Sequence, residues 1–249
     1  MLLICCGMPR SGSTLQFNIA WKTATAGGLG ERVEWRSSND WEHADDELAR
    51  MEAAPELHVI KMHFPPDSVK KLAESGGRVR FVYVHRDLFD VVYSMKTKFN
   101  FSLTHAIERT SHALEAERWL LARPADRVLI QDYALLLNDL PKAVRQVAAF
   151  EGADLDDNAL GAISDELSIT SAYEKSRQKT PRFEHLRRKI SRLLRRKITF
   201  ADEELMLHPN HVSEHRGQIG IGRKKLSEAE IAAVKSAFGD RVAGPANGH

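Results

Sequence analysis

Long apolar runs and paired cysteines are both missing from this 249-residue sequence. Cys5 and Cys6 are adjacent and are the only cysteines, which excludes a disulfide framework and favours a reducing compartment. No stretch approaches the roughly 20 apolar residues of a membrane span, and the first residues lack the cationic segment of a signal peptide. We therefore expect a cytoplasmic protein without a transmembrane segment.

A strong net charge is also missing. The formal charge of +2 gives no overall attraction to nucleic acid, so no nucleic-acid partner is expected. One stretch departs from this balance, because residues 182–197 carry eight lysines and arginines against one acid. Its apolar residues recur at helical spacing, which indicates a solvated helix or lid, with an anionic acceptor, a nucleic acid or a membrane surface as alternatives.

Metal ligands are scarce as well. His208, His211 and His215 have metal-like spacing, but no cysteine lies near them, and we expect no metal site.

Short strand-like runs alternate with helical patterns along the chain, which predicts an α/β fold of three layers, with a central parallel sheet flanked by helices. The expected strands are 2–6, 57–62, 79–84 and 127–131. The expected helices are 14–26, 68–74, 89–99, 103–122, 140–150 and 227–238. We expect one domain over 1–249, whose C-terminal third, from about residue 154, is helical and more irregular.

The segment Gly7-Met8-Pro9-Arg10-Ser11-Gly12-Ser13-Thr14 follows the first apolar strand and precedes a helix. It has the outline of a phosphate-binding P-loop, in which small residues let backbone N–H groups surround phosphate oxygens. Ser13 stands where such loops carry a lysine that contacts the β- and γ-phosphates of ATP or GTP. The sequence thus predicts a phosphate site with little suitability for nucleotide hydrolysis, in which Arg10 supplies a cation.

Two further motifs end predicted strands. Ile60-Lys61-Met62-His63-Phe64-Pro65-Pro66 places a lysine and a histidine two residues apart, on one side of an extended segment. Histidine can accept a proton near neutral pH, and lysine can neutralise developing negative charge. The segment 83–95, YVHRDLFDVVYSM, adds Arg86 and Ser94, which can both bind a phosphate. Alone, each of these two motifs would more often consist of ordinary surface or core residues.

Together these motifs resemble the sulfotransferases that use 3'-phosphoadenosine 5'-phosphosulfate (PAPS). PRSGST is similar to that family's 5'-phosphosulfate loop, IKMHFPP to its K-x-H-x-P segment, and VYVHRDLFDVVYSM to its 3'-phosphate segment. HRGQIG, residues 215–220, resembles the R-K-G-x-x-G stretch that closes over the 3'-phosphate. Residues 130–152 resemble the family's Y-E-D-L helix region.

The resemblance implies a sulfuryl transfer to a hydroxyl or amine, with His63 as general base and Lys61 and Arg10 as charge-stabilising groups. It implies PAPS as donor, adenosine 3',5'-bisphosphate (PAP) as product, and no metal. The implied cofactor-binding residues are Arg10, Ser11, Gly12, Ser13, Thr14, Leu15, Arg86, Ser94, His215, Arg216 and Gly217.

Some positions depart from the family pattern. Arg10 replaces the commoner lysine, Leu15 stands where many members have a tryptophan, and His215 replaces the first arginine of R-K-G. The alternatives are a P-loop small-molecule kinase that uses ATP, and a non-catalytic module that binds a nucleotide or polyanion. The acceptor is expected to be a small molecule or carbohydrate, and the sequence carries no clear dimerisation motif.

Overall fold

The computed structural model describes residues 1–34, 36–168, 170–171, 205, 217–239 and 241. The basic stretch 182–197 and the three histidines at 208, 211 and 215 lie outside the described residues.

Five parallel strands form one sheet in the order β2-β3-β1-β4-β5. They are β1 (Leu2–Gly7), β2 (Gly30–Arg32), β3 (Leu57–Lys61), β4 (Val79–His85) and β5 (Val128–Asp132). β1 lies at the centre and is buried along its whole length, as its continuous apolar run predicts. Because both neighbours of β1 are parallel to it, the segments that follow β1, β3 and β4 come together at one edge of the sheet.

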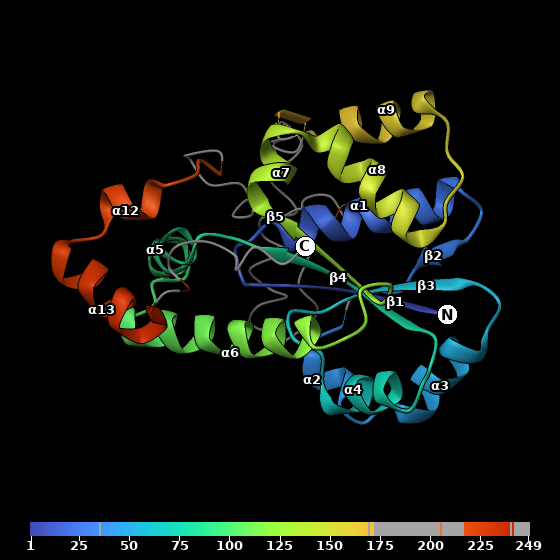
Figure 1. Ribbon diagram of the computed structural model, residues 1–249, viewed down its shortest axis with the longest axis horizontal. Helices are drawn as coiled ribbons and strands as arrows, with labels where there is room; N and C mark the ends of the chain where they lie inside the picture. The colour runs from blue at the N-terminus through green and yellow to red at the C-terminus, as the bar shows by residue number, and fades with distance from the viewer. Residues whose placement is uncertain (35, 169, 172–204, 206–216, 240, 242–249) are drawn as a thin grey trace, which may run out of the picture.

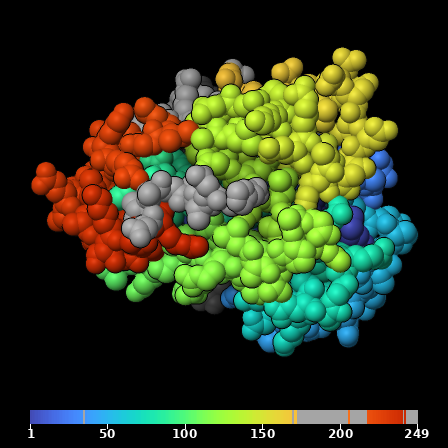
Figure 2. All heavy atoms as spheres, viewed as in Figure 1, coloured from blue at the N-terminus to red at the C-terminus, as the bar shows by residue number. Residues whose placement is uncertain are grey.

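Helices cover both faces of this sheet (Figure 1). One face is covered by α1 (Ser13–Ala26), α7 (Tyr133–Asn138), α8 (Leu140–Glu151) and α9 (Asp157–Glu166). The other face is covered by α2 (Ser38–Trp41), α3 (Asp45–Ala53), α4 (Asp67–Glu74), α5 (Leu88–Phe99), α6 (Leu103–Leu121) and α13 (Glu228–Phe238). The short α12 (Ile221–Lys225) packs against α5 and forms, with α13, one end of the face shown in Figure 2.

The two apolar cores follow the alternation of side chains along the strands. Leu2, Ile4 and Cys6 of β1 belong to the core under α4, α5 and α6, whereas Leu3 and Cys5 belong to the core under α1 and α8. Both cysteines are fully buried and reduced, as their apolar surroundings in the sequence predicted. The three-layer α/β fold is confirmed.

The predicted strands and helices are all present, and no end differs from the prediction by more than one residue. Ser227 and Glu230 form a capping box at the start of α13. Among the described residues, six elements had no predicted range of their own: β2, α2, α3, α7, α9 and α12. α9 and α12 lie in the C-terminal third that was expected to be helical. These elements are short or bury few side chains. β2 is a three-residue edge strand that contains two charged residues, and α3 buries only Leu48.

No helix within the described ranges is long and apolar enough to cross a membrane.

Candidate active site

The loop between β1 and α1 has the shape of an anion-binding loop. Arg10 and Gly12 have positive φ angles, 68° and 89°. Ser11 is fully buried, and its N–H and hydroxyl group donate to the carbonyl oxygen of Met8 at 3.1 and 2.7 Å. Left-handed residues just before a helix N-terminus turn successive backbone N–H groups toward a common centre, where the helix dipole also favours negative charge.

Lys61 supplies, from the neighbouring strand, the cation that the loop lacks at Ser13. Its ammonium group donates to the hydroxyl oxygen of Thr14 at 2.5 Å. Ser13 itself is buried, so the lysine approaches the loop at its helix end. Burial of the Lys61 ammonium group lowers its pKa to about 8, which leaves it largely protonated at neutral pH.

His63 lies beside the same loop and is half-buried. Its Nδ1 lies 3.3 Å from the carbonyl oxygen of Gly7. A carbonyl oxygen only accepts hydrogen bonds, so this contact assigns the proton to Nδ1 and leaves the lone pair on Nε2. Burial, together with the charge of Lys61, lowers the pKa of His63 to about 4. The imidazole is therefore neutral at pH 7, with Nε2 able to accept a proton.

Two arginines lie together at the carboxyl end of β4. Arg10 Nε donates to Ser94 Oγ at 3.0 Å, and Arg86 Nη1 donates to the carbonyl oxygen of Arg10 at 2.9 Å. Burial, and then the charge of Arg86, lower the pKa of Arg10. Arg86 is only 7% exposed, and its buried Nε has no hydrogen-bond acceptor among the described residues. The pair is thus arranged to receive an anion.

Asp90 is a residue of this site that the sequence interpretation missed. It is fully buried on α5, and its carboxylate accepts from the N–H groups of Gly220 and Gly222 at 2.9 and 2.7 Å. Its Oδ2 also lies 3.5 Å from Arg86 Nη2. Asp90 therefore fastens the start of α12 to α5 and orients Arg86. Its role could have been predicted from its position four residues after Arg86, on the buried and otherwise apolar side of the helix.

The absence of a side chain at Gly222 permits this packing. A Cβ atom there would come within 2.2 Å of the backbone of Phe89, which no real structure tolerates. α12 and α5 are thus in backbone contact at this point.

Tyr133 was also missed. The guanidinium carbon of Arg86 lies 4.2 Å from the centre of the Tyr133 ring, a cation–π arrangement that holds the arginine in place. The edge of the same ring packs against the loop, because a Cβ added to Gly12 would lie 2.9 Å from Tyr133 Cδ2. Its place directly after β5, at the edge of the sheet where the other motifs end, was the signal that could have identified it.

The remaining predicted cofactor residues fall into two groups. Leu15 is half-buried and packs against the core that includes α1 and α8, and Gly217 has a positive φ of 74°. His215 and Arg216 lie outside the part of the chain that the structure describes.

A comparison with protein families identifies the chain. A family described as "Sulfotransferase domain" matches residues 2–206. The chain belongs to the sulfotransferase domain family. The match includes β1 to α9 and hence the loop, Lys61, His63, Arg86 and Ser94, so the resemblance drawn from these motifs is confirmed at the level of the family. A search of curated proteins found no match.

Solved structures show the same fold. The mouse sulfotransferase SULT7A1, complexed with PAP, is 14% identical, with a TM-score of 0.62 over 95% of this chain and 81% of that chain. Retinol dehydratase, solved with androsterone and the inactive cofactor PAP, is 17% identical, with a TM-score of 0.55 over 97% of this chain and 80% of that chain. At such low sequence identity, these similarities establish the fold of this sulfotransferase-family chain and nothing more.

Proposed function

We propose that the protein transfers the sulfuryl group of PAPS to a hydroxyl or amine of an acceptor. The observation that carries the proposal is the pair of half-buried Arg10 and buried Arg86 beside an anion-binding loop. Arg86 Nε has no acceptor within the part of the chain that the structure describes. PAPS has two anionic groups, a 5'-phosphosulfate and a 3'-phosphate, and the site has two corresponding cationic regions.

The first region would hold the 5'-phosphosulfate. It consists of the loop from Ser11 to Thr14, with Arg10 and Lys61 beside it. The second region would hold the 3'-phosphate and consists of Arg86, Ser94 and the backbone near Gly217. When bound, PAPS supplies an activated sulfuryl group and PAP as leaving group.

The chain's own residues supply the rest of the chemistry. His63 Nε2 accepts the acceptor's proton while the acceptor oxygen or nitrogen forms its bond to sulfur. Lys61 and Arg10 stabilise the negative charge that develops on the sulfuryl oxygens and on the departing phosphate. Because the site positions charged groups before reaction, little reorganisation is needed as the charge moves.

The alternatives predict other ligands. A kinase of the P-loop class requires ATP with magnesium, and a non-catalytic module binds a nucleotide or polyanion without turnover. Ser13 weighs against the kinase, since the lysine that contacts the β- and γ-phosphates is missing from the loop and Lys61 approaches from β3 instead.

Thermal unfolding with PAP, and separately with ATP and magnesium, tests the proposal. PAP at about a hundred times its dissociation constant should add roughly 2.7 kcal/mol of apparent stability. The shift should disappear in Arg86→Gln and persist in Arg118→Gln, which changes an exposed arginine on α6. A shift with ATP and magnesium alone would contradict the proposal. Incubation with radiolabelled PAPS and an acceptor mixture then separates an enzyme from a binding module.

A further inference from the structure

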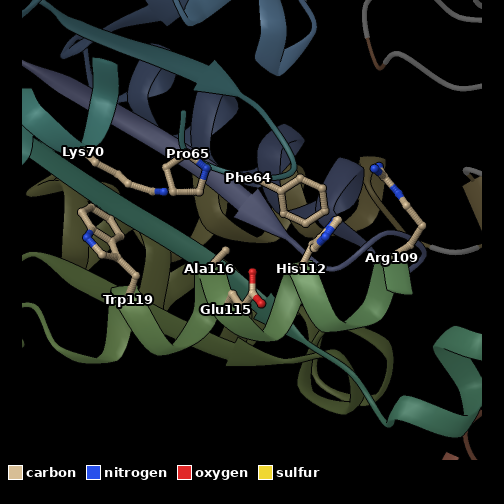
Figure 3. Close-up of a pocket in the computed structure, with 8 residues that line it drawn as sticks. All are labelled: Phe64, Pro65, Lys70, Arg109, His112, Glu115, Ala116 and Trp119. Atoms are coloured by element: carbon tan, nitrogen blue, oxygen red, sulfur yellow. The ribbon is translucent and has the colours of Figure 1, made fainter. Parts of the chain in front are cut away.

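A pocket of about 280 Å³ opens at Phe64, the residue after His63, between the end of β3, α4 and α6 (Figure 3). It is lined by Phe64, Pro65, Lys70, Arg109, His112, Glu115, Ala116 and Trp119. The ring of Phe64 is tilted against that of His63, with centroids 6.2 Å apart, so the pocket begins next to the proposed general base. Its volume lies near the lower end of the roughly 300–1,000 Å³ of ligand pockets, which suits a compound of about one ring.

One face of α6 forms the floor of this pocket. Arg109, His112, Ala116 and Trp119 follow each other at intervals of three and four residues, which places them along one side of the helix. Figure 3 shows Arg109 and His112 toward the Phe64 end and Trp119 with Lys70 at the opposite end. The floor thus changes from polar near His63 to aromatic away from it.

The aromatic end is rigid. Trp119 Nε1 donates to Glu74 Oε1 at 2.9 Å, and its indole ring meets Phe81 edge to face at 5.4 Å between centroids. Because the indole is held by a hydrogen bond and by a core ring, it gives the pocket a fixed wall for the apolar part of a ligand.

The polar end is cationic next to His63. Arg109 lies over the Phe64 ring at 5.3 Å and forms no ion pair with any carboxylate in the described part of the chain. Its charge also contributes to the lowered pKa of His63. Lys70 is paired with Asp67 at 3.3 Å, whereas the carboxylate of Glu115 points up from the floor between Arg109 and Trp119. An anionic ligand group therefore fits at Arg109, and hydroxyl groups fit at Glu115 and His112.

We propose that this pocket binds the acceptor, and that the acceptor is a small hydroxylated ring compound whose single anionic group is held by Arg109. The inference rests on the proposed sulfuryl transfer. Arg109 would hold the anionic group at the end of the pocket next to Phe64, on the same edge of the ring as the hydroxyl that faces His63 Nε2. The rest of the ring would lie along α6 toward Trp119. Arg109 acts here as a specificity-determining residue, because it selects for charge and does not exchange a proton.

Two probes of the same shape and different charge test this proposal. 3-Hydroxybenzoate and its neutral analogue 3-hydroxybenzamide, which carry both groups on one edge of the ring, are titrated by calorimetry into protein saturated with PAP. The benzoate should bind roughly tenfold more tightly, as expected for one charge-assisted hydrogen bond. Arg109→Gln should remove this preference, and Glu115→Gln should enlarge it, because Glu115 repels the anion. Arg118→Gln, on another face of the same helix, should leave the preference unchanged.

Equal affinity for both probes, binding of neither, or a preference that survives in Arg109→Gln would overturn the acceptor proposal. Binding of PAP is measured first in each protein, so that a failure of the donor proposal can be distinguished from a failure of the acceptor proposal. Failure of PAP to bind would contradict the donor assignment, whereas PAP binding without charge preference would contradict only the acceptor assignment.

Discussion

The two ends of the site are held together in different ways. The transfer end consists of the loop after β1 together with Lys61 and His63, which come from the adjacent strand β3 and the segment after it. His63 is fixed there by the backbone carbonyl of Gly7. At the arginine end, Arg86 is positioned by Asp90 and by the carbonyl oxygen of Gln218, and Asp90 in turn holds residues 130 and 132 positions away. The sheet fixes the first end, while the second depends on a late segment docking onto α5.

This difference separates chemistry from donor binding. The transfer end has groups whose pKa values are lowered by burial, which suits proton transfer. At the arginine end, Arg86 has the buried carboxylate of Asp90 beside it and Arg10 of the loop as a neighbouring cation, which suits the binding of an anion. We therefore expect variants at the first end to reduce turnover and variants at the second end to reduce donor affinity and stability.

The largest effect is expected from His63→Ala. Loss of a positioned general base typically lowers the rate by about 10²–10⁴-fold, and kcat should fall by this amount. Affinity for PAP should stay within about twofold, since the arginine end is untouched. His105→Ala, which changes an exposed histidine on α6, serves as the control. Turnover and PAP titration are compared in the three proteins, and an equal loss of kcat and PAP affinity would remove the distinction between the two ends.

The proximity of the residues at the transfer end could be predicted from the sequence. The loop and the Lys61–His63 segment each follow a strand, and adjacency of parallel strands at one edge of a sheet implies that their side chains lie close together. That Lys61 reaches Thr14 was not predicted, because it depends on the register of β1 with β3, in which Cys5 is opposite Lys61.

The arginine end was predicted only in part. Arg86 and Ser94 follow from their motif, whereas the role of Asp90 depends on where α12 docks, a contact between distant segments that local patterns do not encode. The same reason applies to β2 and α3, whose few buried side chains carry little periodicity, and whose formation depends on neighbours in space.

The next largest effect is expected from Asp90→Asn. A neutral amide cannot balance the charge of Arg86. Because both carboxylate oxygens of Asp90 accept from backbone N–H groups, of Gly220 and Gly222, the NH₂ group of asparagine would face one of these donors and lose that hydrogen bond. Breaking a buried ionic contact typically costs about 3–5 kcal/mol, so the free energy of unfolding in urea should fall by about 3 kcal/mol. PAP affinity should fall by roughly tenfold or more, because Arg86 loses its orientation.

Asp126→Asn, at an exposed position between α6 and β5, is the matched control and should change neither quantity. Turnover gives a second check. Because His63 is unchanged in Asp90→Asn, kcat with saturating PAPS should stay within a few-fold of the wild-type value in protein that remains folded. Unchanged PAP affinity in that variant would show that α12 is not part of the donor site.

The third effect concerns pH and only the transfer end. Lys61 has a pKa lowered to about 8, so it loses its charge as the pH rises through that value, and kcat/KM for PAPS should fall about tenfold for each further pH unit. Lys61→Arg stays charged over this range, so its lower activity should show no fall between pH 8 and 10. Lys142→Arg, on the exposed side of α8, should keep the fall of the wild-type protein. If Lys61→Arg also kept it, another group would be responsible, and the charge at the transfer end would not come from Lys61.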